Sequence, residues 1–245
     1  MNIPNQHRLP VKAIIRQAMW SPIALRMQFL KVLIIPVMLL MALYYLRIYL
    51  TGDSYVISLM LSLISFLVYC YFVISVHRVV LLHEDYAGVV IPRLSWRVAR
   101  YLIWFVVVSL ILGLIAAPLM ILNHLMSNDT AGLDKSLLVY FVIMLPAVYV
   151  MARLSLIFPA VALDKRPNIE RAWAMTKNNG WRMFIVIGVL PYLFTLLENV
   201  ISREESTFVE DIVILLLNYV FLIIEISALS FSYQYLVIDR TVREE

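Results

Sequence analysis

The stretch YVISLMLSLISFLVYCYFVISV, residues 55–76, contains no charged residue. At 1.5 Å per residue, a helix needs about 20 residues to cross about 30 Å of hydrocarbon. Mostly apolar stretches of about the same length occur at 29–50, 101–122, 137–158, 183–201 and 212–235. Lipid offers no partner to free backbone groups, and the period-2 alternation of a membrane barrel is absent, so all six stretches are predicted to be helices. The predicted fold class is an all-α, polytopic membrane bundle with six transmembrane helices.

The composition of the 245-residue chain also excludes a soluble globular protein. Hydrophobic residues make up 63% of the chain and charged residues 15%, whereas a soluble domain is about 45–50% apolar and about 25% charged. We expect a single integral membrane domain over residues 1–245, with a cytoplasmic segment at 1–28, the bundle at 29–235 and a cytoplasmic tail at 236–245. This length leaves no room for a separate soluble domain of about 50 residues.

The basic residues predict how the chain is threaded. Fifteen Lys and Arg residues fall in the N-terminal segment, the second and fourth loops and the C-terminal tail, against two in the other three loops. Cytoplasmic loops retain Lys and Arg, so both termini are predicted to be cytoplasmic. The net charge of +4 is divided among loops between the spans, and nucleic acid is therefore not an expected partner.

Two of the basic segments have the periodicity of amphipathic helices that lie in the inner membrane interface. In residues 11–20 the apolar positions share one face, and Lys12 and Arg16 occupy another. In residues 93–102 one face is basic and the opposite face is apolar. The basic face consists of Arg93, Arg97 and Arg100.

A third interfacial helix is predicted at 168–180, with Asn168 as its N-cap and Gly180 at its end. Each interfacial segment precedes an odd-numbered span that contains a proline. These prolines are Pro36, Pro118 and Pro191. The pattern indicates a threefold repeat of interfacial helix and transmembrane hairpin; the alternative is three independent kinks.

Glu225 is the most informative single residue, because it lies near the middle of the last predicted span. A carboxylate at that depth is costly and must be protonated, paired or exposed to a wet cavity. Asn218 and Ser232, seven residues to either side, share its helix face, and Arg153 in the fourth span is its candidate partner. The functional interpretation is a proton, ion or headgroup contact. The alternatives are hydrogen bonds between helices for this face and, for Arg153, a side chain that extends to the interface.

The remaining polar residues do not form a recognisable catalytic or metal site. His77 and His83 are six residues apart and do not share a helix face, so both are interpreted as solvated loop residues. Position 87 is Ala, so an H-E-x-x-H motif that would begin at His83 lacks its second ligand. No nucleotide-binding or nucleophile motif is present, and we expect neither a cofactor nor an enzymatic activity.

Three segments resemble uncharacterised bacterial six-helix inner-membrane proteins, which are similar to the membrane domain that precedes some glycerophosphodiester phosphodiesterases. These segments are FPAVALDKRPNIERAWAMTKNNGWR at 158–182, YQYLVIDR at 233–240 and HRVVLLHE at 77–84. The resemblance implies a bacterial cytoplasmic (inner) membrane and a role beside lipid or envelope metabolism. It implies no catalytic residue, because in the fused proteins the phosphodiesterase chemistry belongs to a separate soluble barrel.

The leading functional hypothesis is a non-enzymatic protein that binds or organises lipid, or a membrane-protein partner, at the inner membrane. Basic interfacial segments attract anionic phospholipid of the cytoplasmic leaflet, and each Lys or Arg contributes about 1 kcal/mol near such a surface. The expected lipid-binding residues are Arg93, Arg97, Arg100 and Arg171. The alternative hypothesis is a small transporter or permease subunit that uses Glu225 as a proton or cation site.

Overall fold

A computed structural model describes residues 8–50, 54–84, 88, 90, 95–127, 145–201 and 208–238. Within these ranges the chain is all-α, as predicted. The first half forms α1 (Val11–Ala24), α2 (Arg26–Leu50), α3 (Tyr55–Leu82) and α4 (Trp96–Ser127). The second half forms a helix at 145–154, α6 (Ile157–Ala162), α7 (Ile169–Met175), α8 (Gly180–Phe184), the π-helix η1 (Ile185–Val189), α9 (Leu190–Ile201), α10 (Phe208–Tyr233) and the π-helix η2 (Gln234–Ile238).

In the part of the chain that the structure describes, six helical segments are long and apolar enough to cross a membrane. They are Arg26–Leu50, Tyr55–Leu82, Trp96–Pro118, Leu145–Ala162, Gly180–Leu197 and Val209–Ile238. Each overlaps one of the six predicted spans, which confirms their number and order. The predicted residues 137–144 lie outside the described part of the chain.

Two of the predicted interfacial helices need correction. The predicted helix at 93–102 is not a separate element, because α4 begins at Trp96 and continues without a break into the span; Arg93 lies outside the described residues. Asn168 does cap α7, and its side chain accepts hydrogen bonds from the backbone N–H groups of Glu170 and Arg171. However, α7 ends at Met175, and Gly180 begins α8 instead of ending a helix.

The position of Gly180 has a steric reason. A Cβ at this residue would collide with the hydroxyl of Tyr149, so a larger residue would displace the Tyr149 side chain from the start of α8. The two elements are therefore packed against each other where the structure turns from α7 into the fifth span. The sequence pattern had suggested a C-terminal glycine because glycine is common there.

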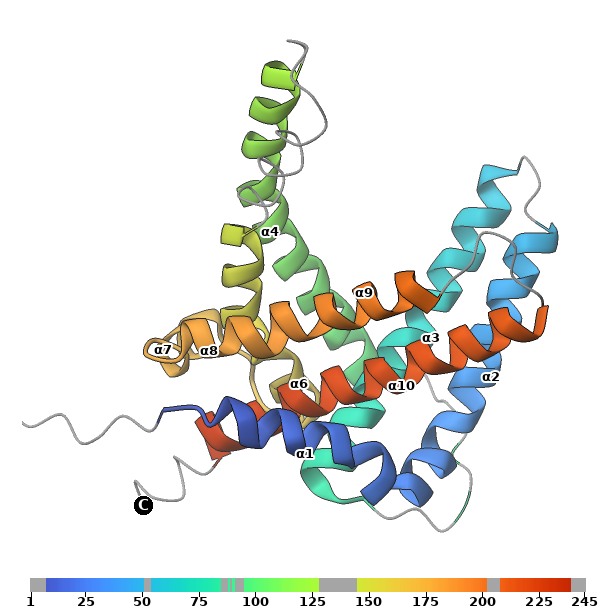
Figure 1. The fold of residues 1–245 in the computed structure, drawn as a ribbon, viewed down its shortest axis with the longest axis horizontal. Helices are drawn as coiled ribbons and strands as arrows, with labels where there is room; N and C mark the ends of the chain where they lie inside the picture. Colours follow the sequence, from blue (N-terminus) through green and yellow to red (C-terminus); the bar gives the residue numbers. More distant parts are fainter. Residues whose placement is uncertain are drawn as a thin grey trace, which may run out of the picture.

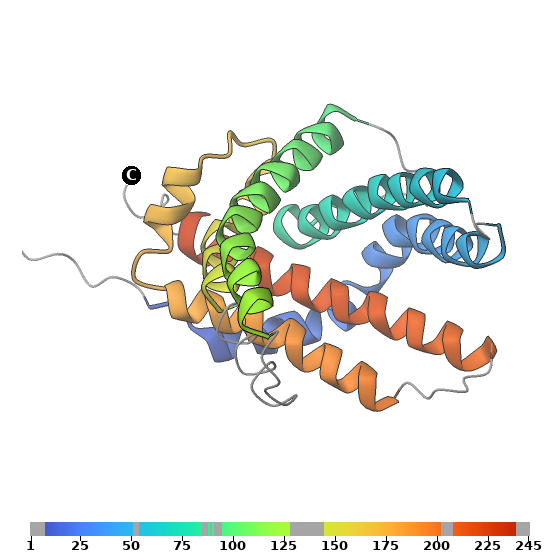
Figure 2. The ribbon, with the colours of Figure 1, turned by 90° about the horizontal axis from the view of Figure 1, so that it is seen from above.

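The helices pack most tightly at one end of the bundle. In Figure 1, α1 lies along the lower side against α10, while α2 and α3 form a hairpin that runs to the upper right. Figure 2 shows α4 crossing over the 145–154 segment, away from that hairpin. In α3 the buried residues run almost entirely from Cys70 to Val80, and in α10 and η2 they run from Ile223 to Val237. The core thus occupies one half of the molecule.

The other half of the same helices is exposed and apolar. Tyr55, Leu59 and Leu63 of α3 are all more than half exposed, as are Val209 and Val213 at the start of α10. These side chains have the composition of a lipid-facing surface. The bundle is therefore tapered: it is closed where the core lies and open at the opposite end.

Candidate functional site

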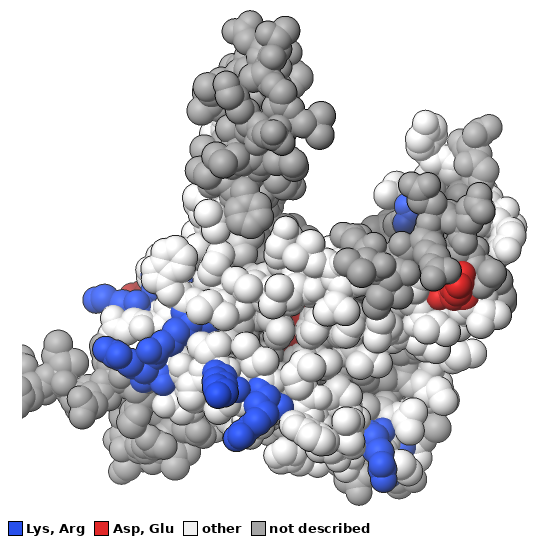
Figure 3. Space-filling model, in the orientation of Figure 1, with Lys and Arg blue, Asp and Glu red and all other residues white. Residues whose placement is uncertain are grey.

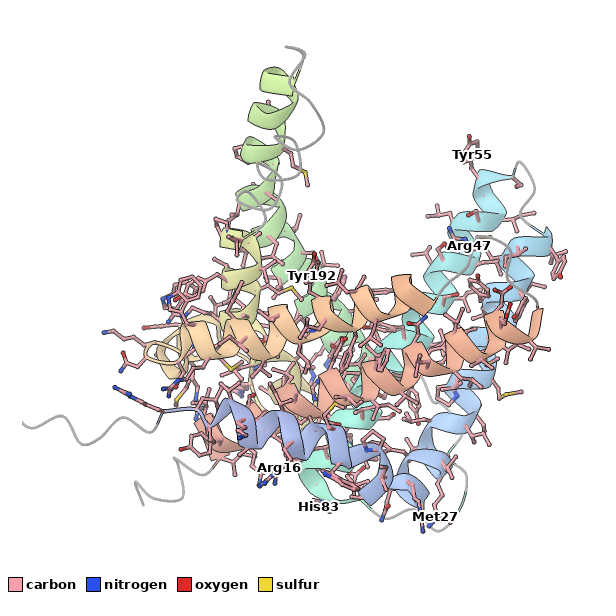
Figure 4. All side chains as sticks on the ribbon, viewed as in Figure 1. Arg16, Met27, Arg47, Tyr55, His83 and Tyr192 are labelled. Atoms are coloured by element: carbon pink, nitrogen blue, oxygen red, sulfur yellow. The ribbon has the colours of Figure 1, made fainter. Side chains whose placement is uncertain are left out.

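The closed end of the molecule carries most of the described basic side chains, and we call it the basic end. It is defined by Lys12, Arg16, Arg78, Arg97, Arg100, Lys165, Arg166 and Arg171. Figure 3 shows most of the visible Lys and Arg along the lower and left sides, and its largest group of acidic atoms lies on the right, where α10 begins with Glu210 and Asp211. In Figure 4, Arg16 and His83 mark the basic end, and Arg47 and Tyr55 mark the opposite one.

Exposed tryptophans accompany the basic residues. Trp20 of α1 is 60% exposed, Trp96 of α4 is 72% exposed and Trp181 of α8 is 68% exposed. Tryptophan is enriched at the level of lipid headgroups, where its ring has one apolar and one polar side. The basic end therefore has the surface chemistry of a membrane interface.

An arginine cluster joins three elements at this end. Arg97 Nε donates to both carboxylate oxygens of Asp164, at 3.1 and 3.0 Å, and the Nη2 atoms of Arg97 and Arg100 also bind this carboxylate. Arg78 of α3 lies 3.6 Å from Asp164 and forms a second ion pair with Glu84. Arg78 Nη1 donates to the carbonyl oxygen of Ala162 at 3.1 Å. The cluster consequently ties α3 and α4 to the end of α6.

The cluster favours the ionised form of Asp164. The hydrogen bond from Arg97 is the largest cause, and the positive charges of Arg97, Arg100 and Arg78 act in the same direction, so the pKa of Asp164 lies below its ordinary value. Partial desolvation opposes this shift. Two of the predicted lipid-binding arginines, Arg97 and Arg100, are thus already bound to a carboxylate of the same chain.

Asp164 also has an unusual backbone. Its φ is 57°, in the left-handed region where glycine is the usual residue. Asp164 N–H donates to the carbonyl of Val161 at 3.1 Å, and Lys165 N–H donates to that of Ala160 at 2.9 Å. This pair of hydrogen bonds is the Schellman motif that ends a helix. An aspartate in this position supplies a carboxylate that a glycine would not.

Arg153 does not pair with Glu225. Its side chain is 6% exposed, Nε donates to Thr176 Oγ1 at 3.1 Å, and Nη2 donates to the carbonyl of Trp173 at 2.6 Å. Its guanidinium also lies 3.6 Å from the ring centroid of Trp173, a cation–π distance. These contacts hold α7 and the turn after it against the 145–154 helix. The alternative interpretation, a side chain that extends to the interface, is not observed either, because the guanidinium is buried against α7.

The polar line on α10 is also only partly formed. Glu225 and Asn218 are half-buried, and each has a polar or electrostatic interaction within the structure. Ser232 is fully buried, and its hydroxyl donates to the carbonyl of Ala228 at 2.8 Å. Of the four residues suggested for a transmembrane ion site, Arg153 is bonded to α7 and Thr176, whereas the Ser232 hydroxyl donates within its own helix and keeps its oxygen as an acceptor.

The prediction that His77 is a solvated loop residue is wrong. The helix does not end near residue 76 but continues to Leu82, and His77 is fully buried. Its Nδ1 lies 2.8 Å from Ser230 Oγ of α10. Sequence reasoning missed this contact because His77 follows directly on an apolar stretch and precedes Arg78, which suggested the end of the span.

The fold and surface define a multi-pass, all-α membrane protein by helix length and hydropathy. No group of three or more His, Cys, Asp or Glu residues converges on a point in the described ranges. Comparison of the chain with protein-family models, with curated proteins and with solved structures gives no match. The function is therefore argued from the basic end itself.

Proposed function

We propose that the protein is a non-enzymatic integral membrane protein whose basic end faces the cytoplasm and binds anionic phospholipid of the inner leaflet. The resemblance of residues 158–182 to bacterial six-helix proteins supports a bacterial inner membrane and a role beside lipid or envelope metabolism. The positive-inside rule supports the orientation, because the basic end carries most of the described Lys and Arg residues.

The structure of α1 is the observation that carries this proposal. One face of α1 is buried against the bundle through Ile14 and Ala18. The exposed face carries Trp20 and the cations Lys12 and Arg16. This arrangement supports a helix at the interface, because the exposed Trp20 suits the level of the lipid headgroups and the two cations can reach lipid phosphates.

Spin-labelled lipids provide the test, because their spectra separate lipid held at the protein surface from bulk lipid. The purified protein is reconstituted with labelled phosphatidylglycerol or phosphatidylcholine, and the relative association constant is measured at low and high salt. We expect phosphatidylglycerol to be preferred and the preference to fall with salt, since exposed charges are screened.

A pair of variants gives the control. Neutralising Lys12 and Arg16 with glutamine reduces the preference, whereas Arg47→Gln at the opposite end leaves it unchanged. Equal association constants for the two lipids in the wild-type protein would refute the proposal. Release of free fatty acid or headgroup from phospholipid by the purified protein would refute its non-enzymatic part.

A further inference from the structure

A small pocket opens at the basic end, between α6, α7 and the end of the last span. Its volume is about 30 Å³. Ile157 and Ala160 of α6, Ala172 and Met175 of α7, and Tyr233 and Val237 near the end of the last span supply its apolar floor. Three basic side chains, Lys165, Arg166 and Arg171, line it as well. The pocket is thus a concave apolar site with cations from two sides.

The charge of this pocket differs from that of the arginine cluster. Among the residues that the structure describes, no Asp or Glu lines this pocket, whereas Asp164 and Glu84 partly neutralise the arginine cluster. Lys165, Arg166 and Arg171 are exposed. Arginine presents paired N–H donors that match phosphate oxygens, and lysine adds a compact charge. The lining therefore selects an anion with several oxygen acceptors.

The loop that carries Lys165 and Arg166 is held in place from its other side. The Schellman motif fixes the backbone at residues 164–165, and the arginine cluster binds the Asp164 carboxylate. Asn168 caps α7, so the start of the helix that carries Arg171 is fixed as well. The three cations consequently project from a preorganised backbone, which lowers the cost of ordering them around a ligand.

The position of the pocket identifies the source of the anion. Ile157 belongs to the fourth candidate span and Val237 to the sixth, and both residues lie close to the basic ends of these spans. This is the depth at which phospholipid phosphates lie when the spans cross a bilayer. The pocket is too small for acyl chains, which would remain along the outer surface of the helices, while the exposed cations at its mouth can contact a phosphate.

We propose that this pocket binds the phosphate of one anionic phospholipid, with Lys165, Arg166 and Arg171 as its ligands and the lipid chains outside the pocket. This site rests on the proposed function and deepens it, because it adds one defined lipid to a general preference for an anionic surface.

Native mass spectrometry of the full-length protein tests the site. The protein in mild detergent is titrated with phosphatidylglycerol or phosphatidylcholine, and the bound lipids are counted. The wild-type protein retains one phosphatidylglycerol more tightly than any further lipid. Each neutralised cation weakens this first binding about fivefold, so Arg171→Gln shows a moderate loss and the combined K165Q/R166Q/R171Q variant a nearly complete one.

The control variant Arg47→Gln removes a cation from the opposite end of the molecule and keeps the first lipid. Thermal unfolding of each variant verifies the fold, and because the three pocket cations are exposed, their replacement by glutamine leaves the melting temperature unchanged. Inorganic phosphate at millimolar concentration does not displace the lipid.

Three results would refute the proposal that this pocket binds a lipid phosphate. They are retention of the first lipid by the triple variant, equal retention of phosphatidylcholine, and release of the lipid by inorganic phosphate, which would make the site one for a small soluble anion. If the lipid site in the pocket is refuted while spin-labelled phosphatidylglycerol is still preferred, the proposed function remains supported. If both preferences are absent, the two proposals fall together.

Discussion

Substitutions of Asp164 separate a backbone contribution to stability from a charge contribution at the same position. Asp164→Gly removes the carboxylate and also relieves the left-handed backbone, whereas Asp164→Ala removes the carboxylate and keeps a Cβ at φ 57°. Relief of a Cβ in this region contributes about 1 kcal/mol. The Gly and Ala variants should therefore differ by about this amount in their free energy of unfolding.

The charge contribution is modest because the cluster is partly solvated. The Asp164 side chain is 44% exposed, and those of Arg97 and Arg100 are each 29% exposed. Ion pairs of this kind contribute about 0.2–1 kcal/mol each, so loss of the carboxylate costs about 1–2 kcal/mol in total. We expect Asp164→Gly to lower the free energy of unfolding by at most about 1 kcal/mol, and Asp164→Ala by about 2 kcal/mol.

Cys70 provides the assay, since it is the only cysteine in the chain and is fully buried. A fluorogenic maleimide reports the fraction of unfolded protein during thermal or denaturant unfolding in detergent. If Asp164→Ala proves as stable as Asp164→Gly, the reasoning about the backbone is wrong. If Asp164→Asn, which tolerates the left-handed backbone, matches the wild type, the ion pairs contribute nothing measurable.

Three further predictions concern the acid stability, two glycines and the orientation of the protein. The folded state lowers the pKa of Asp164, so the stability it contributes is present above the ordinary aspartate pKa and is lost as the pH falls below it; Asp164→Asn should lose less stability than the wild type in that acid range. Gly188→Ala should lower the melting temperature, because its Cβ would lie 2.7 Å from a valine methyl group, whereas Gly113→Ala has nothing within 4 Å and should be neutral or stabilising; equal effects would exclude the steric cause. In intact cells, a membrane-impermeant maleimide should label Tyr55→Cys and not Arg16→Cys, and the reverse pattern would invert the proposed orientation.

The spans were predictable from the sequence because their signal is summed over about 20 residues and tolerates errors at the ends. Their boundaries were less predictable. α3 runs on through His77 and Arg78, since the buried Ser230 and the carbonyl of Ala162 supply partners for these polar side chains. The hydropathy of a segment gives no information about its contacts with residues that are distant in the sequence. The same limit applies to α4, whose basic first turn suggested a separate interfacial helix.

The sequence indicated that arginines gather at one end of the molecule, but it did not indicate which side chains they bind. Arg97, Arg100 and Arg171 were all selected for their charge; Asp164 binds the first two, whereas Arg171 lines a pocket to which no described Asp or Glu contributes. A signal did exist in the sequence: aspartate at the end of an apolar helix, where a glycine would be expected, indicates a carboxylate with a specific role. Arg153 was expected either to pair with Glu225 or to extend to the interface, whereas its observed bonds go to α7 and Thr176.

The taper of the bundle has a consequence for the membrane around it. The described helices are packed together at the basic end and diverge toward the other (Figure 1), so in a bilayer these helices would occupy unequal cross-sections in the two leaflets. A wedge of this kind imposes a spontaneous curvature on its lipid annulus. It should accordingly partition between flat and highly curved vesicles in a way that a cylindrical six-helix bundle would not.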